Sequence, residues 1–525
     1  MKGKFDINGK DEDRQTEIEN ATFEEAISAT GFGKFNLVLV ALSVPCGWAS
    51  MMDTTTMSYV VPAAHCDLDL NLQQRGMLNA ITYLGMITSA LLWGFLADTL
   101  GRKKILIAGY LIDAVCVIIA GLSQSYEMLV TAKFFTGLIM NGPFAALTTT
   151  ISEFHSAKHR TRTMLALGVM YGFGQLVIPG LGWLLIPRKL DFELLDGRMH
   201  LHSWNFFILV CSIPSIIAFV GHCFLPESPK FLMTTGRNVE ALRTFKRVYS
   251  LNTGKHPDTF PIKSLVDETK LNLGGKHGGA VTANRTKTQA LKEGWQQIAP
   301  MFFPPHLWKI ILASAIQCGL MWGTNTIRLW LPQIFTAMND YQLLHPGETA
   351  SFCTMLSIIS PDDNVTTIEE CFVSEVSDSV YINAIIVSGT SIIVLGIISG
   401  AINKLGKKPT LLTLTIISAV ASICFYFAPN STTVVALSTI NITFLGIALN
   451  LELTIVVDMF PTTLRAIAVS ITLMIGRSGA MVGNVVFPYL LAAGCLPPFV
   501  MVGSILLLSG GLTLLLPKTD MKALE

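Results

Sequence analysis

The stretch Gly94-Phe95-Leu96-Ala97-Asp98-Thr99-Leu100-Gly101-Arg102-Lys103-Lys104 joins one long apolar segment directly to the next. Two membrane helices linked so tightly must turn back on one face of the bilayer, and short loops rich in Lys and Arg stay cytoplasmic. Gly94 lets a neighbouring helix approach closely. Asp98 can pair with Arg102, four residues on, or face the positive N-terminus of another helix. The stretch predicts two membrane helices joined by a charged cytoplasmic turn; the alternative is a turn that is merely basic.

The composition indicates a lipid bilayer as the chain's surroundings. Of 525 residues, 51% are hydrophobic and only 14% charged, with a mean hydropathy of +0.53. This is too apolar for an ordinary soluble protein. The net charge of +1 gives no reason to expect nucleic-acid binding. Because GxxxxGK[ST], HExxH and CxxC motifs are absent from the sequence, we expect no enzyme, no cofactor and no metal site.

Twelve apolar runs are long enough to cross about 30 Å of hydrocarbon at 1.5 Å per residue. Residues 1–34 precede them as a polar cytoplasmic tail without a signal-peptide pattern. Six runs lie near 35–62, 77–97, 104–122, 128–151, 163–186 and 204–225, and six near 307–335, 380–402, 409–427, 432–457, 466–491 and 498–516. The sequence therefore predicts an all-α membrane protein with twelve transmembrane helices.

Charge places the connecting segments on opposite sides of the membrane. Residues 227–306 carry twelve Lys and Arg, which predicts a cytoplasmic linker. This linker connects two groups of six helices, at 35–226 and 307–516. The loop 339–379 has no Lys or Arg but eight Asp and Glu, so it must face outside or a lumen. With a tail at 517–525, both termini are expected in the cytoplasm.

The acidic loop holds two further predicted features. Asn364 begins an Asn-Val-Thr sequon on the side where glycans are added, whereas the sequon at Asn284 lies in the cytoplasmic linker and should stay bare. Cys353 and Cys371 share the oxidising side and could form a disulfide. Cys66 and Cys495 are the alternatives, as competing partners or as free thiols.

Two motif pairs repeat at one spacing along the chain. Gly101 recurs as Gly406, and 406 − 101 = 305. An acid seven residues before an arginine occurs as Glu153 and Arg160, and again as Asp458 and Arg465, where 458 − 153 and 465 − 160 are both 305. The shared offset indicates a duplication of six helices plus six.

The first stretch resembles the loop between helices two and three of the major facilitator superfamily. The resemblance implies two six-helix bundles that rock about a solute bound at mid-membrane. It also implies a cytoplasmic gate latched through Asp98 and Arg102. Asn403 replaces Asp98 in the second half, so the two gates should be asymmetric. The candidate gating residues are Gly94, Asp98, Gly101, Arg102, Glu153, Arg160, Glu227, Asp458 and Arg465.

A closer resemblance rests on Pro226-Glu227-Ser228-Pro229-Lys230-Phe231-Leu232, which looks like the signature that closes the first half of sugar and organic-ion transporters. The stretch from His202-Ser203-Trp204 to Pro214-Ser215, with Tyr83-Leu84-Gly85-Met86, resembles the synaptic vesicle glycoprotein 2 and two-related-protein branch. Leu449 and Leu453 stand where that branch has tryptophan and aspartate, so its drug binding is not expected here.

Six charged residues fall inside the predicted spans, where each costs at least about 2.5–3.5 kcal/mol without a partner. They are Asp53, Asp113, Lys133, Arg328, Glu452 and Arg477. Asp53 and Lys133 differ in depth by only about 6 Å and can pair. They match positions where proton-coupled sugar porters carry an aspartate and an arginine, which implies proton coupling; the alternative is a static salt bridge. Asp113 is expected at the periphery, for packing, and Glu452 at the inner gate.

Two arginines in one half favour an anionic or zwitterionic ligand, since a guanidinium grips a carboxylate bidentately. Arg477 matches an arginine that organic-anion transporters place in the cavity. Arg328 follows Asn325, which matches a substrate-contacting asparagine of the sugar porters. The alternative is a structural pairing of one arginine with Glu452 or Asp458. Further candidates on cavity-lining helices, each of which could instead serve packing, are Tyr171, Gln175, Trp322 and Asn450.

The sequence thus predicts a monomeric secondary active transporter that moves a small organic anion or zwitterion by rocker-switch alternating access, coupled to protons. One alternative is a uniporter in which Asp53 and Lys133 are only structural. Another is a non-transporting vesicle or receptor-like protein of the same fold. Plasma membrane and vesicle membrane both remain open.

Overall fold

The computed structural model describes residues 20–188, 190–194, 199–266, 299–346, 350–359, 377–461 and 464–517. Side chains at 91, 94, 95, 97, 98 and 399–405 lie outside this description. The chain forms two compact units. One contains Met1–Ala41, Thr148–Leu165 and Pro226–Arg285, and the other contains Leu42–Leu147, Ala166–Leu225 and Thr286–Glu525.

Eleven helices in the described residues are long and apolar enough to cross a membrane. The 29-residue helix α3 (Leu72–Leu100) is a twelfth of comparable length, which agrees with the prediction of twelve. The eleven are α2 (Lys34–Ala64), α4 (Arg102–Gly121), α5 (Tyr126–Glu153), α6 (Ala157–Leu185), the pair α7 (Ser203–Cys211) and α8 (Ile213–Phe224), α13 (His306–Leu344), α15 (Asp378–Leu405), α16 (Lys407–Cys424), α17 (Ser431–Met459), α18 (Arg465–Ala492) and α19 (Leu496–Thr513).

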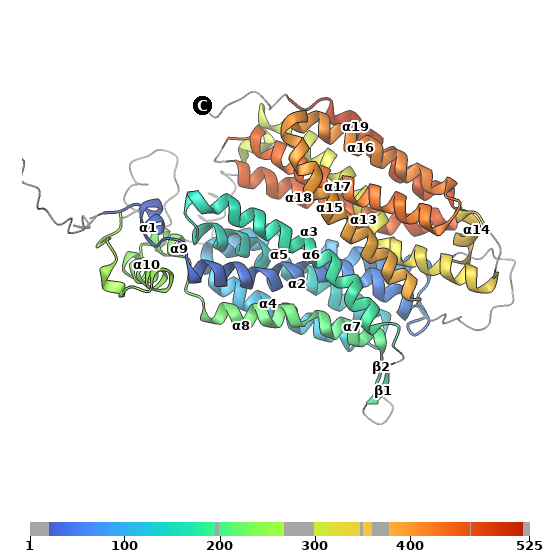
Figure 1. The fold of residues 1–525 in the computed structure, drawn as a ribbon, viewed down its shortest axis with the longest axis horizontal. Helices are drawn as coiled ribbons and strands as arrows, with labels where there is room; N and C mark the ends of the chain where they lie inside the picture. Colours follow the sequence, from blue (N-terminus) through green and yellow to red (C-terminus); the bar gives the residue numbers. More distant parts are fainter. Residues whose placement is uncertain are drawn as a thin grey trace, which may run out of the picture. The chain divides into compact units, whose positions relative to one another are not determined.

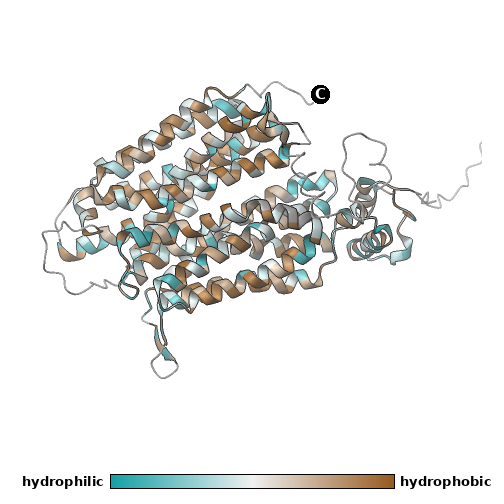
Figure 2. Cartoon of the chain, turned by 180° about the vertical axis from the view of Figure 1, so that it is seen from behind, coloured by the Kyte–Doolittle hydropathy of each residue, from teal (hydrophilic) through white to brown (hydrophobic). Residues whose placement is uncertain are grey.

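The larger unit contains most of the length of these helices, in two groups that follow the two halves of the sequence. In Figure 1 the group α2–α8 lies beside the group α13–α19. Helix α4 packs against α7 and α8, while α13 packs against α17, α18 and α19. Helix α3 packs along α18, so the halves meet there. Figure 2 shows apolar residues along the long helices. This is expected for helices that cross a lipid bilayer, where each helix satisfies its own backbone polar groups.

Small residues allow the closest helix crossings. A side chain at Gly85 in α3 would collide with the Phe134 carbonyl of α5, and one at Gly137 in α5 would collide with the Thr82 carbonyl of α3. Glycine is therefore required on both sides of this crossing, because van der Waals contact between backbones replaces the hydrophobic effect inside a membrane.

The repeated glycines have nearly the same backbone conformation. Gly101 has φ 89° and ψ 158°, and Gly406 has φ 84° and ψ 152°. Only glycine adopts this region readily. Each residue is followed at once by a helix, α4 from Arg102 and α16 from Lys407. The 305-residue repeat seen in the sequence is thus a repeat of backbone geometry.

The smaller unit contains α1 (Phe23–Ala29), α9 (Pro229–Thr234), α10 (Asn238–Thr253) and η1 (Pro257–Thr259). Thr22 and Glu25 form a capping box at the start of α1, and the hydrogen bonds from Thr22 hold the pKa of Glu25 below its usual range. Ala21 pairs with Leu265 in a parallel bridge. The end of the predicted tail therefore folds together with the beginning of the predicted linker.

Short elements complete the described chain. Strands β1 (Asp191–Leu194) and β2 (Met199–His202) form an antiparallel hairpin before α7. The others are α14 (Phe352–Leu356), η2 (Ala299–Phe302), η3 (Ser357–Ile359) and η4 (Phe425–Phe427).

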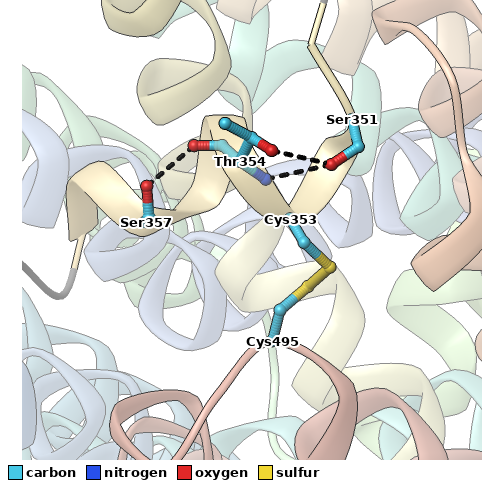
Figure 3. The surroundings of a disulfide bond; sticks show 5 residues. All are labelled: Ser351, Cys353, Thr354, Ser357 and Cys495. Atoms are coloured by element: carbon cyan, nitrogen blue, oxygen red, sulfur yellow. Dashed lines mark hydrogen bonds between the residues drawn. A yellow bond between two sulfur atoms is a disulfide. The ribbon is translucent and has the colours of Figure 1, made fainter.

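A disulfide joins Cys353 of α14 to Cys495 at the start of α19 (Figure 3), with 5.5 Å between the Cα atoms. The predicted pair Cys353 and Cys371 is therefore wrong, although Cys495 was the stated competitor. Ser351 caps α14 by accepting the Thr354 N–H, which fixes the position of Cys353. Cys66 is also disulfide-bonded.

Candidate functional site

A cluster of polar side chains connects the two halves of the larger unit. Arg328 of α13 donates to Asn325 Oδ1 at 2.7 Å and to the Tyr83 hydroxyl of α3 at 3.3 Å. Tyr83 in turn donates to Asn325 Oδ1 at 2.9 Å. The Asn325 amide also donates to its own helix, to the Met321 carbonyl at 3.1 Å. Asn325 of α13 and Tyr83 of α3 thus hold one guanidinium in place.

Arg477 of α18 is held in the same way from the other side. Its Nη1 donates to Asn141 Oδ1 of α5 at 2.6 Å. Tyr171 of α6 interacts electrostatically with both Arg328 and Arg477, and Tyr83 interacts with Arg477. We call Tyr83, Asn141, Tyr171, Asn325, Arg328 and Arg477 the central cluster.

Both guanidinium groups of the central cluster have only uncharged hydrogen-bond partners among the described residues. Neither arginine pairs with Glu452 or Asp458, which was the structural alternative for these cations. Both carboxylate oxygens of Glu452 are buried without a hydrogen-bond donor among the described residues, and Asp458 pairs with Lys407 at 2.6 Å. Arg328 Nε has no hydrogen-bond partner in the described part of the chain. Within that part, no carboxylate is bonded to either guanidinium of the central cluster.

A small cavity of about 30 Å³ lies beside Arg328. It has room for about two water molecules, so it must widen to admit an organic solute. Its lining combines the polar groups of Tyr59, Gln175 and Arg328 with an apolar wall. The remaining lining residues are Thr55, Leu331, Pro332, Ala384, Val387, Ser388 and Ile442.

The other predicted ligand residues are placed differently. Gln175 lines the cavity, and Tyr171 lies in the central cluster. Trp322 of α13 packs near Gly483 of α18, and its buried indole N–H has no hydrogen-bond partner among the described residues. Asn450 is exposed and donates to the Gly446 carbonyl of its own helix. Neither Trp322 nor Asn450 is among the residues that line the described cavity.

Asp53 and Lys133 are both buried in the N-terminal half, with 3% and 1% of their surface exposed. They interact electrostatically, but no direct ion pair joins them within the described residues. Asp113, which was expected to serve packing on a peripheral helix, is fully buried, with 0% of its surface exposed. It lies against Asp53 and accepts a hydrogen bond from Ser215 at 2.6 Å.

The repeated acid and arginine motifs make equivalent local bonds. Arg160 donates to the His155 carbonyl and Arg465 to the Phe460 carbonyl, each five residues earlier in the chain. Arg160 also pairs with Glu24 at 3.0 Å. Each arginine therefore stabilises the turn between two long helices.

The acids of these motifs bond to neighbouring segments. Glu153 Oε2 accepts the Ser228 hydroxyl of the Pro226–Leu232 signature, and Glu227 Oε1 accepts the Ser228 N–H at 2.9 Å. Asp458 pairs with Lys407, the residue that follows Gly406. In the repeat, Lys407 corresponds to Arg102.

Several predictions fall outside the described residues. These are the surroundings of Gly94, the side chain of Asp98, and the residues Asn364 and Cys371.

Sequence reasoning did not place Tyr83, Asn141 or Tyr59 at the candidate site, and it assigned Asp113 to packing. Tyr83 stands in a motif used for the resemblance, but nothing in that motif indicates that its hydroxyl reaches α13. Polar residues in apolar helices were the available signal, although many of them bond only within their own helix.

Comparisons with known proteins agree with this arrangement. The family model described as "Sugar (and other) transporter" matches residues 43–342. Synaptic vesicle glycoprotein 2B of Rattus norvegicus is 31% identical over 230 residues, covering 44% of this chain and 34% of that protein. Synaptic vesicle glycoprotein 2A of Bos taurus is 25% identical over 346 residues, covering 63% and 46%. The chain thus spans less than half the length of these two relatives.

Among solved structures, a D-xylose-proton symporter is similar to the whole fold. Its TM-score is 0.61 at 17% identity, and the alignment covers 93% of this chain and 99% of the symporter. At this identity the likeness shows the fold alone.

Proposed function

The chain belongs to the sugar (and other) transporter family within the major facilitator superfamily, and we propose that it is a secondary active transporter of a small organic anion or zwitterion. The solute binds between the two halves, beside Arg328 and Arg477, and crosses by rocker-switch alternating access.

One observation carries the proposed charge preference. Arg328 and Arg477 have only neutral partners among the described residues. Both arginines are partly buried, and a cation that loses part of its hydration without gaining a counter-ion is destabilised. A carboxylate that enters beside the cluster supplies the missing charge, and it accepts charge-assisted hydrogen bonds from a guanidinium that neutral side chains already hold in position.

The lining of the cavity favours a solute with an apolar body. Leu331, Val387 and Ile442 offer hydrocarbon contact, while Gln175 and the Tyr59 ring offer polar groups beside it. A small organic acid with an apolar portion matches both kinds of lining. A sugar needs many hydroxyl partners and has no charge to offset the arginines, so it matches less well.

Proton coupling is proposed from the buried charges and not from the likeness to the D-xylose-proton symporter. In this proposal Asp53 exchanges a proton during the cycle while Lys133 stabilises its charged form. We assign the two acid-and-arginine motifs to the gate; they contain Glu153, Arg160, Asp458 and Arg465. The other residues assigned to the gate are Gly94, Asp98, Gly101, Arg102 and Glu227.

Uptake into proteoliposomes tests the proposal. Labelled carboxylates should accumulate when a pH gradient is imposed, whereas their methyl esters should not. Uptake without accumulation in any gradient indicates the uniporter. A folded protein that moves no member of a panel of carboxylates, amines and sugars indicates the non-transporting alternative.

Arg477→Ala tests the charge preference directly. Charge-assisted hydrogen bonds contribute about 1.5–3 kcal/mol, so carboxylate affinity should fall about ten- to a hundredfold. Arg477→Lys should keep part of the affinity, because it keeps the charge but loses the bidentate geometry. Arg188→Ala removes an exposed arginine outside the cluster and should change nothing. Unaltered affinity in Arg477→Ala would exclude Arg477 from the site.

A further inference from the structure

Two acids and one base meet inside the N-terminal half, away from the central cluster. Asp53 lies on α2, Asp113 on α4 and Lys133 on α5, and at most 3% of each residue is exposed. Charged side chains this deep in a membrane helix bundle require partners that balance them. The three residues supply two negative charges against one positive charge if all are ionised.

The two carboxyl groups are neighbours. Asp53 and Asp113 interact electrostatically with one another, and each interacts electrostatically with Lys133. Asp53 Oδ2 and Asp113 Oδ1 are both buried, and neither meets an N–H or O–H donor of another described residue. The Ser215 hydroxyl donates a hydrogen bond to the other oxygen of Asp113, Oδ2, at 2.6 Å.

The remaining titratable groups around the pair do not supply a second cation. Tyr110 and Cys116 come from α4, Cys46 from α2 and Cys211 from α7. Phenols and thiols are neutral at physiological pH when no base activates them. His222 of α8 stacks on the Tyr110 ring, and its Nδ1 bonds to the Ala218 carbonyl of its own helix.

An ionised carboxylate only accepts hydrogen bonds, so the buried oxygens of the two neighbouring acids can satisfy one another only if one of the acids carries a proton. Two carboxylates that share one site cannot both be ionised without a large repulsion. One proton on the pair, opposite a charged Lys133, makes the group of three electrically neutral. We propose that Asp53 and Asp113 form a proton-binding site that holds a single proton between them, with Lys133 as the counter-ion of the second charge.

The packing suggests different roles for the two acids. Asp113 is fixed, since α4 packs against α8 and Ser215 of α8 donates to it. Asp53 lies on α2, which also carries the cavity residues Thr55 and Tyr59. A solute that shifts α2 therefore acts on the acid that shares the proton. The use of this proton in transport rests on the proposed function, but its binding does not.

Infrared spectroscopy of the purified full-length protein tests the site, because a protonated carboxylic acid has its own C=O stretching band. The wild-type spectrum should contain this band near neutral pH, with the shift expected on transfer to D₂O. Asp113→Asn and Asp53→Asn should each remove the same component, since the single remaining carboxylate is then balanced by Lys133. Glu452→Gln removes an isolated buried acid and should leave that component intact.

A second variant covers the case in which the asparagine variants fail to fold. Lys133→Met removes the counter-ion, so both acids should be protonated and the band should about double. A wild-type spectrum without the band, a band that persists unchanged in Asp113→Asn, or a band that does not grow in Lys133→Met would each overturn the shared proton.

Uptake measurements separate this site from the transport proposal. If the band behaves as expected but a pH gradient does not drive uptake, the proton site stands and the coupling fails. If a pH gradient drives uptake in wild type while the band persists in Asp113→Asn, the coupling stands and the shared proton is wrong.

Discussion

At the scale of single residues, Tyr83 is the side chain on which the geometry of the central cluster depends. Its hydroxyl donates to Asn325 and accepts from Arg328, and so joins α3 to α13. A guanidinium that is held before the ligand arrives loses less conformational entropy on binding. Tyr83 therefore acts on affinity through the arginine that it positions.

Tyr83→Phe should weaken carboxylate binding about tenfold, since it removes about 1.4 kcal/mol of positioning hydrogen bonds. Tyr381→Phe is the control, because the Tyr381 hydroxyl is buried without a hydrogen-bond partner among the described residues. Equilibrium binding of a labelled carboxylate measures both. Equal affinities in the two variants would contradict the role given to the Tyr83 hydroxyl.

At the scale of elements, the two glycine joints set the direction of the helices that follow them. Gly101 ends α3 and begins α4, and Gly406 lies directly between α15 and α16. Both have a positive φ and an extended ψ, a backbone conformation that is unfavourable for any residue with a side chain. Each joint therefore turns the chain through a conformation that the flanking residues alone would not adopt.

Gly101→Ala and Gly406→Ala should each lower the free energy of unfolding by about 1–3 kcal/mol, the cost of this backbone region for a residue with a side chain. Gly396→Ala in α15 should not, because nothing lies within 4 Å of its added Cβ and alanine favours a helix. Thermal unfolding of the three variants in detergent provides the measurement. A melting temperature unchanged in both joint variants would contradict the geometry.

The Cys353–Cys495 bond attaches α14 to the start of α19 across 142 residues of sequence. Cys353→Ser and Cys495→Ser should each lower the free energy of unfolding by about 2–5 kcal/mol, and the double variant should lower it no further. Cys424→Ser is the control, since Cys424 is free. Peptide mapping without reduction should recover the crosslinked pair. Recovery of Cys353 joined to Cys371 would instead support the sequence-based pairing.

At the scale of the whole molecule, hydrogen bonds join the two halves near the proposed site. Arg477 reaches Asn141, Arg328 reaches Tyr83, and the Asn79 amide reaches the Leu329 carbonyl at 3.4 Å. Alternating access requires the halves to separate on one side of the membrane at a time. In the proposed transport cycle these bonds break and re-form, and an anion bound to the arginines competes for the same donors.

The membrane orientation gives a prediction for the whole chain. Asn364→Gln should increase gel mobility when the protein is made in a glycosylating host, because the acidic loop is expected on the glycosylated side. Asn284→Gln, in the basic linker, should leave the mobility unchanged. The reverse pattern would show that the assignment of the two sides is wrong.

The sequence alone determined the membrane class, the number of spans and the 305-residue repeat. These follow from local properties, because the lipid forces each span to satisfy its own backbone and glycine marks a turn in any context. It also identified Arg328, Arg477, Asp53 and Lys133, since a charge in an apolar run is visible without a structure.

Only the tertiary structure decided which of these residues meet. The sequence fixes the depth of a side chain along a helix but not the rotation of that helix against its neighbours. Asp113 was therefore predicted only to serve packing, and the structure shows that it lies near Asp53 and accepts a hydrogen bond from Ser215. In the same way, Cys353 was paired with a cysteine near it in sequence, whereas folding brings the distant Cys495 beside it. Contacts between helices depend on packing that no single segment encodes.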